Sequence, residues 1–561
     1  MPDATTVSSR PVVSIGGSAI GDESLAGLIG ALVVDRLTAP DMFELVFADP
    51  DRKALKDAGL EIGTEVTIEG ETGDEGELLE LIKGEVTAIE FEYDSRGGRA
   101  IVRGYDKSHR LAAGRKTATY QQMSYSEIAN QIATDAGLDA EVDTTEGSFD
   151  HVFQVNQSDL DFLYGLARLA NRDFRVDGST MLFKEPVPSD DAPEEGDPES
   201  PGPGQLVCGD KLQHFRARVS AVGQVAKVEV RGWDPREKKE VTGEAVPTAA
   251  HAGVTLKPDA LAEKIGGKTL VVVNHGVSDA ETAETVAKAR AEQIGSAAFE
   301  ATGVARGDAS LKAGVPVSIS GVGEDLSGKW VIAGSRHEFI DGQYRTHLEF
   351  TGRQDRTLFG LFNQGVGGGG TGGSGERVPG VVTAIVDDNA DPEKMGRVRL
   401  KYPWMGPDAV SYWARLSAPG AGKDTGMVWL PQVGDEVLVA FEHGDTSRPI
   451  VVGGLWNGSD LIPFTYDEDL DAGKVTYCGW TSRTGHKISI WESSTDSQIQ
   501  LLTAGGAVNV ILDDKNKEVR IETTGKMVFD AQQDVQIKAG GAMSLEATGT
   551  MTVKGASISL E

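Results

Sequence analysis

Side chains that could do chemistry are scattered along this 561-residue chain rather than grouped. Asp513 and Asp514 form the best acid pair of its C-terminal part, and a carboxylate pair is what hydrolysis of a glycosidic bond requires. The pair lies in the turn-like run 513–517, which favours a loop. His443 and His486 have no serine or cysteine nucleophile in a recognisable elbow, so solvated or packing roles are favoured over proton transfer.

The two cysteines, Cys208 and Cys478, lie far apart in the sequence and in no Cys-x-x-Cys context. This pattern argues against a disulfide framework and against a thiolate metal site. We therefore expect two free thiols that are buried or half-buried.

The charge balance excludes several functions. Lys and Arg number 54 and Asp and Glu number 86, so the formal net charge is −32 and the pI is about 4.7. A surface this acidic repels nucleic-acid phosphates and anionic lipid headgroups unless a strong basic patch intervenes, and the sequence shows none. The longest apolar run, 28–34, is far shorter than the roughly 18 residues that a membrane helix needs. Residues 1–13 lack the basic and apolar regions of a secretory signal, so we expect none.

Two breaks in composition divide the chain. Residues 186–205 are rich in proline and acidic residues and predict a surface excursion or linker. Residues 365–375 are almost all glycine and predict a flexible tether. About 360 residues of mixed pattern precede the tether, and a part that reads almost entirely as strands follows it.

The first part alternates predicted strands with helices. Runs such as 42–48, 65–69 and 85–93 alternate apolar and polar residues, as half-buried strands do. A serine followed three residues later by an acid predicts helix starts at Ser124, Ser158 and Ser278, and Gly137 is a plausible stop for the first helix. Apolar residues follow at helical spacing, typical of core stripes: Ile128 and Ile132; Leu163, Leu166, Ala167 and Ala170; Ala283, Val286, Ala287 and Ile294.

The part after the tether begins with short predicted strands at 378–386, 396–402, 412–416, 426–429, 436–442 and 449–455. Their number and spacing fit a small antiparallel barrel of the length of an OB fold. Nucleic-acid or sugar binding would need a basic groove with stacking aromatics. A packing role is favoured for the aromatics, most of which lie beside proline or glycine: Tyr402, Trp404, Tyr412, Trp413, Trp429 and Trp456.

The C-terminal segment has an eight-residue repeat of apolar residues, which is typical of a solenoid. One column comprises Val519, Met527, Val535, Met543 and Met551, and a second comprises Ile521, Phe529, Ile537, Leu545 and Val553. Gly525, Gly541 and Gly549 fill the seventh place of their octads, with Gln533 in the remaining one, which predicts a sharp corner there. Each octad therefore predicts a short strand followed by a corner.

An octad presents too few inward residues for one chain to close a dry core, whereas octads from three chains would close a triangle. The repeat therefore predicts an intertwined homotrimeric β-helix whose apolar columns face the threefold axis. An ordinary β-meander is the alternative, although it does not need such regular spacing.

Ordered motifs across the chain resemble those of the valine-glycine-repeat (VgrG) spike proteins of contractile injection systems. The barrel segment carries Val378-Pro-Gly-Val-Val, Asp391-Pro-x-x-x-Gly396, Tyr402-Pro-Trp404, Leu430-Pro-x-x-Gly434-Asp-Glu-Val and Leu455-Trp-Asn-Gly458. Ser482-Arg-Thr-Gly485-His486 is similar to the family's entry into its needle. The N-terminal part resembles the family's hub at Val102-Arg-Gly-Tyr105-Asp, Gln154-Val-Asn-Gln157 and Val228-Glu-Val-Arg231-Gly-Trp233.

The resemblance implies a mainly β fold with an α+β N-terminal hub of two barrels with helical insertions, an OB-fold barrel and a C-terminal intertwined trimeric β-helix. It predicts these domains: a first hub barrel with a helical subdomain at 1–200, a second at 201–364, a linker at 365–376, an OB fold at 377–460 and the needle at 475–561. The two columns above would then form the trimer core of the needle.

The function implied is that of a structural spike that links the tube and baseplate to a membrane-piercing tip. Expected partners are two further copies of the chain, tube and baseplate proteins on the hub side, a PAAR-type tip protein and possible effector cargo. We expect no nucleic acid and only transient contact with a membrane. The tip protein would dock at the C-terminal end, at Ile558, Leu560 and Glu561. The chain would be made in the cytoplasm and join a particle, with an extracellular phage-tail-like particle favoured over type VI secretion.

Departures from the family's enzymatic members are informative. Residues 459–474 are too few for the lysozyme that some phage spikes insert there, and no histidine follows His486 to form the iron site of some phage needles. We therefore predict no catalytic residue, no metal and no cofactor. A β-helical tailspike enzyme, either a glycosidase or a polysaccharide lyase, is the alternative, and a carbohydrate-binding adhesin is a weaker one.

Overall fold

The computed structural model describes residues 10–49, 52–73, 76–95, 97–195, 202–273, 277–352, 378, 380–406 and 408–559. The predicted tether at 365–376 and the predicted docking residues Leu560 and Glu561 lie outside these ranges. The chain forms two compact units, Met1–Leu455 and Trp456–Glu561. Within the described residues, no helix is long and apolar enough to cross a membrane.

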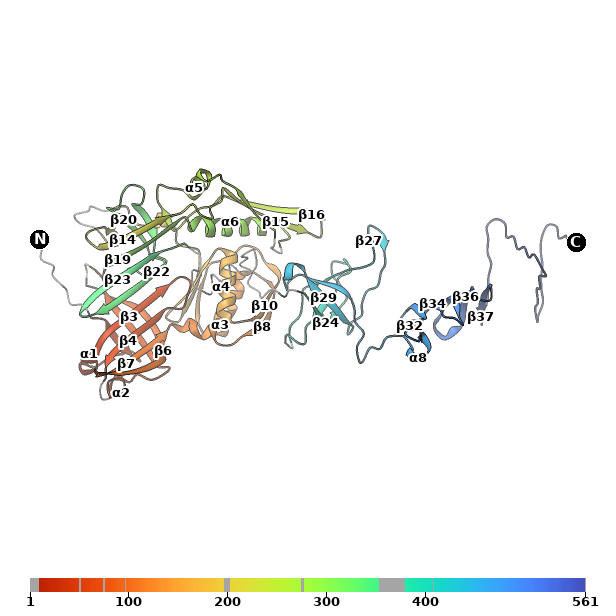
Figure 1. Cartoon of the computed structure of the whole chain (residues 1–561), viewed down its shortest axis with the longest axis horizontal. Helices are drawn as coiled ribbons and strands as arrows, with labels where there is room; N and C mark the ends of the chain where they lie inside the picture. Colours follow the sequence, from red (N-terminus) through yellow and green to blue (C-terminus); the bar gives the residue numbers. More distant parts are fainter. Residues whose placement is uncertain are drawn as a thin grey trace. The chain divides into compact units, whose positions relative to one another are not determined.

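An 11-stranded sheet is the framework of the first unit (Figure 1). Each strand pairs antiparallel with its neighbours. The order is β14 (Leu212–Val219), β19 (Phe299–Arg306), β23 (Gln343–Phe350), β22 (Gly334–Ile340), β3 (Leu28–Arg36), β4 (Met42–Ala48), β7 (Gly97–Tyr105), β6 (Leu78–Asp94), β5 (Glu65–Glu71), β1 (Val12–Ile15) and β2 (Ser18–Ala19).

The pairing of β22 with β3 joins strands from both sides of the proline-rich excursion in one sheet. The alternation predicted for 42–48 is confirmed, because Phe43, Leu45 and Phe47 on β4 are fully buried. The division into two barrels near residue 200 stays a prediction.

Four smaller sheets complete the hub region. They are β10 (Phe149–Gln157) with β8 (Lys116–Met123); β11 (Asp173–Asp177), β12 (Thr180–Lys184) and β9 (Asp139–Val142); β13 (Gln205–Val207), β20 (Pro316–Ser320), β21 (Gly328–Val331) and β17 (Ala252–Gly253); and β16 (Lys239–Ala245), β15 (Lys227–Asp234) and β18 (Thr269–Val272).

Two of the three predicted helix starts are confirmed. Helix α3 (Tyr125–Asp135) begins after Ser124, whose side chain and that of Glu127 form a reciprocal capping box. Gly137 follows its end with a φ of +69°. Helix α4 (Asp159–Ala170) is capped by Ser158.

The third predicted start was wrong by one residue. Helix α6 (Ala280–Ser296) is capped by Asp279, because the Asp279 carboxylate accepts hydrogen bonds from both the amide and the hydroxyl of Thr282. Shorter helices that the pattern did not predict are α1 (Asp22–Gly27), α2 (Ala54–Ala58), α5 (Pro258–Lys264), η1 (Lys107–Ala112) and η2 (Ser189–Asp191).

The barrel segment after the tether forms a five-stranded sheet in the order β25 (Arg399–Lys401), β24 (Val381–Asp388), β29 (Glu436–Phe441), β30 (Pro449–Gly454) and β26 (Arg415–Leu416), with the 3₁₀ turn η3 (Glu442–Gly444). The strand predicted at 426–429 was wrong. A two-stranded hairpin of β27 (Ala421–Gly422) and β28 (Thr425–Gly426) ends at Gly426, whose φ is +139°, and residues 427–429 pair with no strand.

The second unit contains an antiparallel meander of five strands in sequence order: β33 (Tyr477–Thr481), β34 (Lys487–Glu492), β35 (Ser497–Leu502), β36 (Val508–Asp513) and β37 (Glu518–Thr523). A short helix α8 (Tyr466–Asp469), the pair β31 (Leu470–Asp471) and β32 (Lys474–Val475), and a 3₁₀ turn η4 (Ala504–Gly506) accompany it. Residues 477–523 of the single chain therefore form a β-meander, the structure given above as the alternative to a trimeric β-helix.

Residues 524–559 contain no helix or strand in the single chain. The backbone bends at 524–525, 532–533, 540–541 and 548–549. The corners predicted at Gly525, Gln533, Gly541 and Gly549 are thus confirmed, while the intertwined trimer built from them stays a prediction.

Candidate functional site

The apolar side chains of both predicted columns are exposed. All ten, from Val519 to Val553, have exposed fractions between 42% for Met527 and 78% for Phe529. A soluble protein rarely leaves so long a run of large apolar side chains in water unless another molecule covers it. The columns are therefore a candidate association surface.

The strand register of the meander extends both columns toward the N-terminus. Val519 lies opposite Leu512, and the row of paired residues continues through Ile499 and Ile490 to Cys478. Ile521 lies opposite Val510, which continues through Leu501 and Ile488 to Trp480. Residues directly opposite one another share a face of a sheet, so these ten residues form two parallel rows, which we call the apolar rows.

The face that carries the apolar rows is the solvent-exposed one. Ile488, Ile499, Leu501 and Leu512 are 43–47% exposed, whereas Ser489, on the opposite face of β34, is buried. A sheet that packs on its own chain usually buries its apolar residues and exposes its polar ones. This sheet does the reverse, because its apolar rows are exposed and Ser489 is buried. Sequence reasoning missed these rows because hairpin turns interrupt the eight-residue period, and only the register aligns them.

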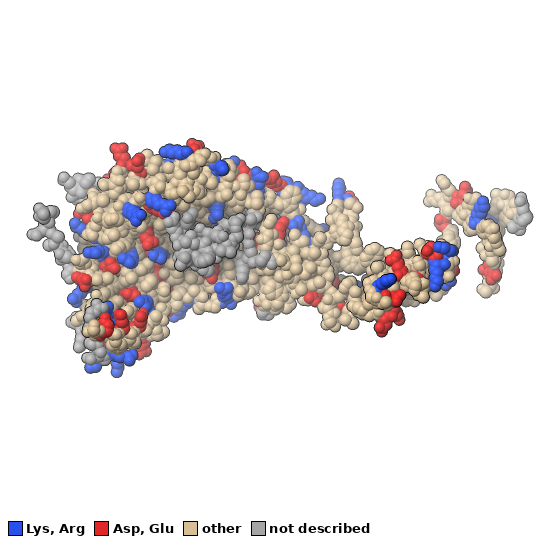
Figure 2. Space-filling model, in the orientation of Figure 1, with Lys and Arg blue, Asp and Glu red and all other residues tan. Residues whose placement is uncertain are grey.

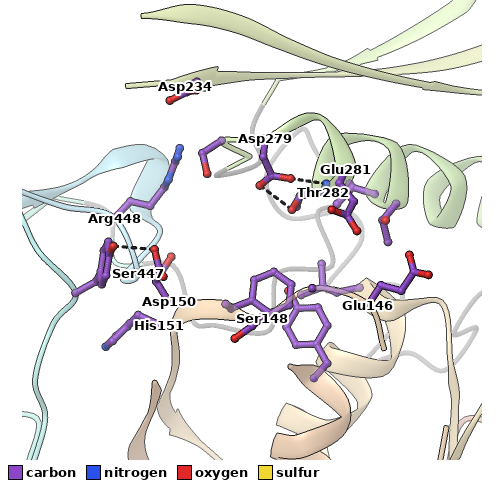
Figure 3. Close-up of a pocket in the computed structure, with 18 of the residues that line it drawn as sticks. Glu146, Ser148, Asp150, His151, Asp234, Asp279, Glu281, Thr282, Ser447 and Arg448 are labelled. Atoms are coloured by element: carbon purple, nitrogen blue, oxygen red, sulfur yellow. Dashed lines mark hydrogen bonds between the residues drawn. The ribbon is translucent and has the colours of Figure 1, made fainter. Parts of the chain in front are cut away.

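A second feature is a cleft of about 950 Å³ in the first unit (Figure 3). Acidic side chains from several elements line it: Asp234, Asp279 and Glu281 on one side, and Glu146 and Asp150 on the other. The Asp150 carboxylate accepts hydrogen bonds from Tyr412 Oη at 2.7 Å and from Gln122 Nε2 at 2.8 Å. Burial raises the pKa of Asp150, but these bonds and the charges of Arg236 and Arg397 outweigh it and leave that pKa below its ordinary value.

Two buried side chains that line the cleft, Arg397 and His151, make structural contacts. Arg397 forms a two-pronged ion pair with Asp391, at 2.7 and 3.1 Å, and the pair lowers the pKa of Asp391 to about 2. His151 is buried, and its Nε2 lies 2.9 Å from the Val410 carbonyl oxygen. Burial lowers the pKa of His151, so the imidazole is neutral at pH 7 and donates to that carbonyl.

Two polar side chains of the cleft make structural hydrogen bonds. The hydroxyl of Ser447 donates to Asp445, and His151 faces a backbone carbonyl, so neither arrangement activates a nucleophile. Among the described residues, no group of three or more His, Cys, Asp or Glu side chains is arranged to hold a metal ion.

The other candidate residues occupy structural positions. Residues 514–517 form the turn between β36 and β37, where Asp513 accepts from the Asn516 amide and Asp514 pairs with Lys517, which confirms the loop interpretation. His486 Nδ1 accepts from the Ala504 amide, and His443 lies in η3. Both cysteines are free thiols, as predicted, and Cys208 is half-buried. The burial predicted for Cys478 was wrong, because it lies on the exposed face of β33.

The packing role predicted for the barrel aromatics holds for Tyr402, which is fully buried. Trp429 and Trp456 are 60% and 66% exposed, so within the single chain they do not pack. Lys and Arg side chains are interspersed with Asp and Glu on the face drawn in Figure 2, as expected for a mixed, solvated surface.

Comparison with known proteins assigns the fold a family. A family model described as the Alg8 N-terminal domain matches residues 51–341, more than half of the chain. The chain belongs to the Alg8 N-terminal domain family. A second model, described as the type VI secretion system/phage-baseplate injector OB domain, matches residues 382–456 and so covers β24 to β30.

Curated relatives of this Alg8-domain chain include spike proteins. The type VI secretion system spike protein VgrG1b of Pseudomonas aeruginosa is 29% identical over 135 residues, which are 23% of this chain and 17% of that protein. The actin cross-linking toxin VgrG1 of Vibrio cholerae is 25% identical over 171 residues, 28% of this chain and 16% of that protein. The matched segments thus span about a sixth of these relatives' length. The resemblance to VgrG-type spike proteins is confirmed.

Among solved structures, a chain of the Francisella PdpA-VgrG complex in its lidded form superposes with a TM-score of 0.52 at 8% identity. The match covers 89% of this Alg8-domain chain and 76% of that chain. It shows a shared fold, and together with the OB-domain match it confirms the predicted mainly β architecture with an OB-type barrel.

Proposed function

We propose that this chain is the structural protomer of a homotrimeric spike in a contractile injection system. In this proposal residues 1–200 and 201–364 form the hub, 377–460 the OB domain and 475–561 the needle. The observation that carries it is the exposed pair of apolar rows, which lead without a break into the two octad columns. Similarity to VgrG spike proteins supports the same function.

Three copies would bury the apolar surface that a single copy of the needle leaves exposed. Val519 and Ile521 belong to both the rows and the columns, so one continuous apolar surface runs along the C-terminal unit. Bends every eight residues let each chain pass from one side of a triangular prism to the next. Burying the ten column side chains around a common axis would remove them from water, and each large side chain contributes about 1.5–3 kcal/mol when fully buried.

The partners follow from this role. Tube and baseplate proteins would bind the hub, and a PAAR-type tip protein, with or without effector cargo, would bind the C-terminal end. Ile558, 55% exposed, is the described member of that docking site, which Leu560 and Glu561 would complete. The spike would reach a membrane only during puncture, after assembly in the cytoplasm into a particle for extracellular release.

We also propose that the chain itself performs no catalysis and needs no metal or cofactor. The toxin activity in the name of the Vibrio relative belongs to a protein of which only 16% is matched here. Similarity to VgrG spike proteins favours a structural role over a tailspike glycosidase or lyase.

The native mass of the purified chain tests this function. A trimer has a mass of about 178 kDa, three times that of the 59.4 kDa chain, and we expect this mass by native mass spectrometry or light scattering. Deletion of residues 519–561 is expected to return it to the monomer. A monomeric full-length chain would contradict the proposed function.

A further inference from the structure

The OB domain carries an apolar segment that no described residue of the chain covers. It follows the β27–β28 hairpin, which projects away from β24 and β29 (Figure 1). We call residues 427–433 the OB arm. Its apolar side chains are exposed by 39–90%: Met427, Val428, Trp429, Leu430 and Val433. Met427 at 39% and Val428 at 90% are the extremes of a segment far less polar than an ordinary loop.

The same domain has an apolar sheet face outside its core, one residue of which, Ile450, also lines the cleft of the first unit. Val382, Ala384 and Val386 point into the barrel core, so their neighbours on β24 point outward. Val381 lies opposite Ala440, which lies opposite Ile450, and all three are outside the core. Val381 is 56% exposed. We call this row, with its outward neighbours Leu438 and Val452, the outer face.

The part of the outer face around Val381 and Val452 is open as well as apolar. Val452 is 47% exposed at a bulge of β30, and a Cβ added at Gly453 or Gly454 would meet no atom within 4 Å. Trp404 borders the face, because its indole N–H donates to the Thr383 carbonyl at 2.8 Å while 55% of the residue stays exposed. An apolar surface edged by an exposed tryptophan is suited to receive an apolar segment.

We propose that the OB arm of one copy docks on the outer face of the OB domain of a second copy. In such a head-to-tail contact, one surface of a domain binds a different surface of the next copy. The copies close into a ring when the rotation between neighbours is a whole fraction of a turn, and a threefold ring has three such contacts. This inference rests on the proposed homotrimer. It adds a second association surface, separate from the needle.

A second copy is the occupant because the chain itself brings copies together. Strand β30, which contributes Ile450 and Val452 to the outer face, ends at Gly454, and the C-terminal unit begins at Trp456. Once three C-terminal segments associate, their OB domains are tethered at high effective concentration, so a modest apolar contact is populated. A different protein as occupant of the face is an outcome that the experiment distinguishes.

Site-specific photocrosslinking tests the contact in the full-length chain. A benzoylphenylalanine replaces Val428, and chains of two nitrogen isotopes are mixed before assembly so that crosslinks between copies are recognised by mass. We expect crosslinks between copies to peptides that contain residues 381–385, 438–440 or 450–454. The same group at Val222, an 83% exposed hub valine, serves as the control and should not reach these peptides.

The outcomes separate this inference from the proposed function. A trimeric native mass with Val428 crosslinks only within one chain, to another region of a copy, or to a co-purifying protein overturns the docking and leaves the spike intact. A monomeric mass overturns both. As a second measurement, Val428→Asp is expected to raise hydroxyl-radical modification of Trp404 several-fold, and Val222→Asp is expected to leave it unchanged. Equal modification in both variants would also overturn the docking.

Discussion

Tyr412 Oη donates a hydrogen bond of 2.7 Å to Asp150 Oδ2 and thereby joins the OB domain to strand β10 of the hub region. Arg236 lies 3.5 Å from the same carboxylate oxygen and 3.2 Å from Glu393 Oε1 of the OB domain. Phe153 of β10 packs in the OB core beside Tyr402. These contacts connect the OB domain to the hub region within the first unit.

Replacing Tyr412 by Phe removes this hydrogen bond and leaves the ring in place. We expect a loss of about 1–2 kcal/mol, because the acceptor is ionised but partly exposed, seen as a drop of a few degrees in the thermal midpoint. Tyr93→Phe, at an exposed tyrosine, is the control and should change nothing.

The pH dependence of the Tyr412 variant provides a second readout. The folded pKa of Asp150 is below its ordinary value, so its stabilising effect is present above that ordinary value and is lost as the pH falls through the folded pKa. The difference between the native protein and Tyr412→Phe should shrink in this acid range. A constant difference would assign the effect to packing.

Two buried histidines predict acid sensitivity of the hub. Burial, with Lys312 as a smaller cause, lowers the pKa of His337 to about 3, and burial lowers that of His251 to about 4. The unfolded chain binds a proton at each below about pH 6.5, so folding stability falls from there toward the folded pKa, by about 1.4 kcal/mol per pH unit for each histidine.

Denaturant unfolding between pH 7 and pH 5 measures this slope. His337→Gln and His251→Gln are expected to flatten it by about that amount each, and Val222→Ala, at an exposed residue that does not titrate, is expected to keep it. The use of two buried positions guards against one variant that does not fold. An unchanged slope in both variants would contradict the prediction.

The cap of α6 can be tested with adjacent residues. Asp279→Ala removes both hydrogen bonds to Thr282 and is expected to cost about 1 kcal/mol and to speed amide exchange in the first turn of the helix. Ser278→Ala leaves those bonds intact and should have no measurable effect. Equal effects would contradict the corrected helix start.

Two neighbouring residues, Phe529 and Val528, provide a test and a control for the predicted needle. Phe529 belongs to the second column and Val528, 64% exposed, lies between the columns. Phe529→Asp would bury a charge at the threefold axis and is expected to abolish the trimer, whereas Val528→Asp should leave the native mass at that of a trimer. Loss of the trimer in both variants would show that the columns do not define an inward face.

Some features of this protein followed from local sequence. The capping residues Ser124 and Ser158 set helix starts because a helix's first amides need nearby acceptors, and that requirement is met within four residues. The octad corners at Gly525 and Gly541 were likewise readable, because the repeat itself marks where the backbone bends. The motifs of the barrel segment were specific enough to predict its OB architecture.

Other features needed the tertiary structure. The pairing of β22 with β3 joins strands some 300 positions apart, and no local pattern selects such a partner. The apolar rows escaped detection because antiparallel register, not a sequence period, aligns Trp480 with Ile488 and Leu501. The Tyr412–Asp150 bond depends on how two separately patterned segments dock. Sequence determined the elements and the repeat because these depend on near neighbours, whereas long-range packing decided which faces remain free to bind other copies.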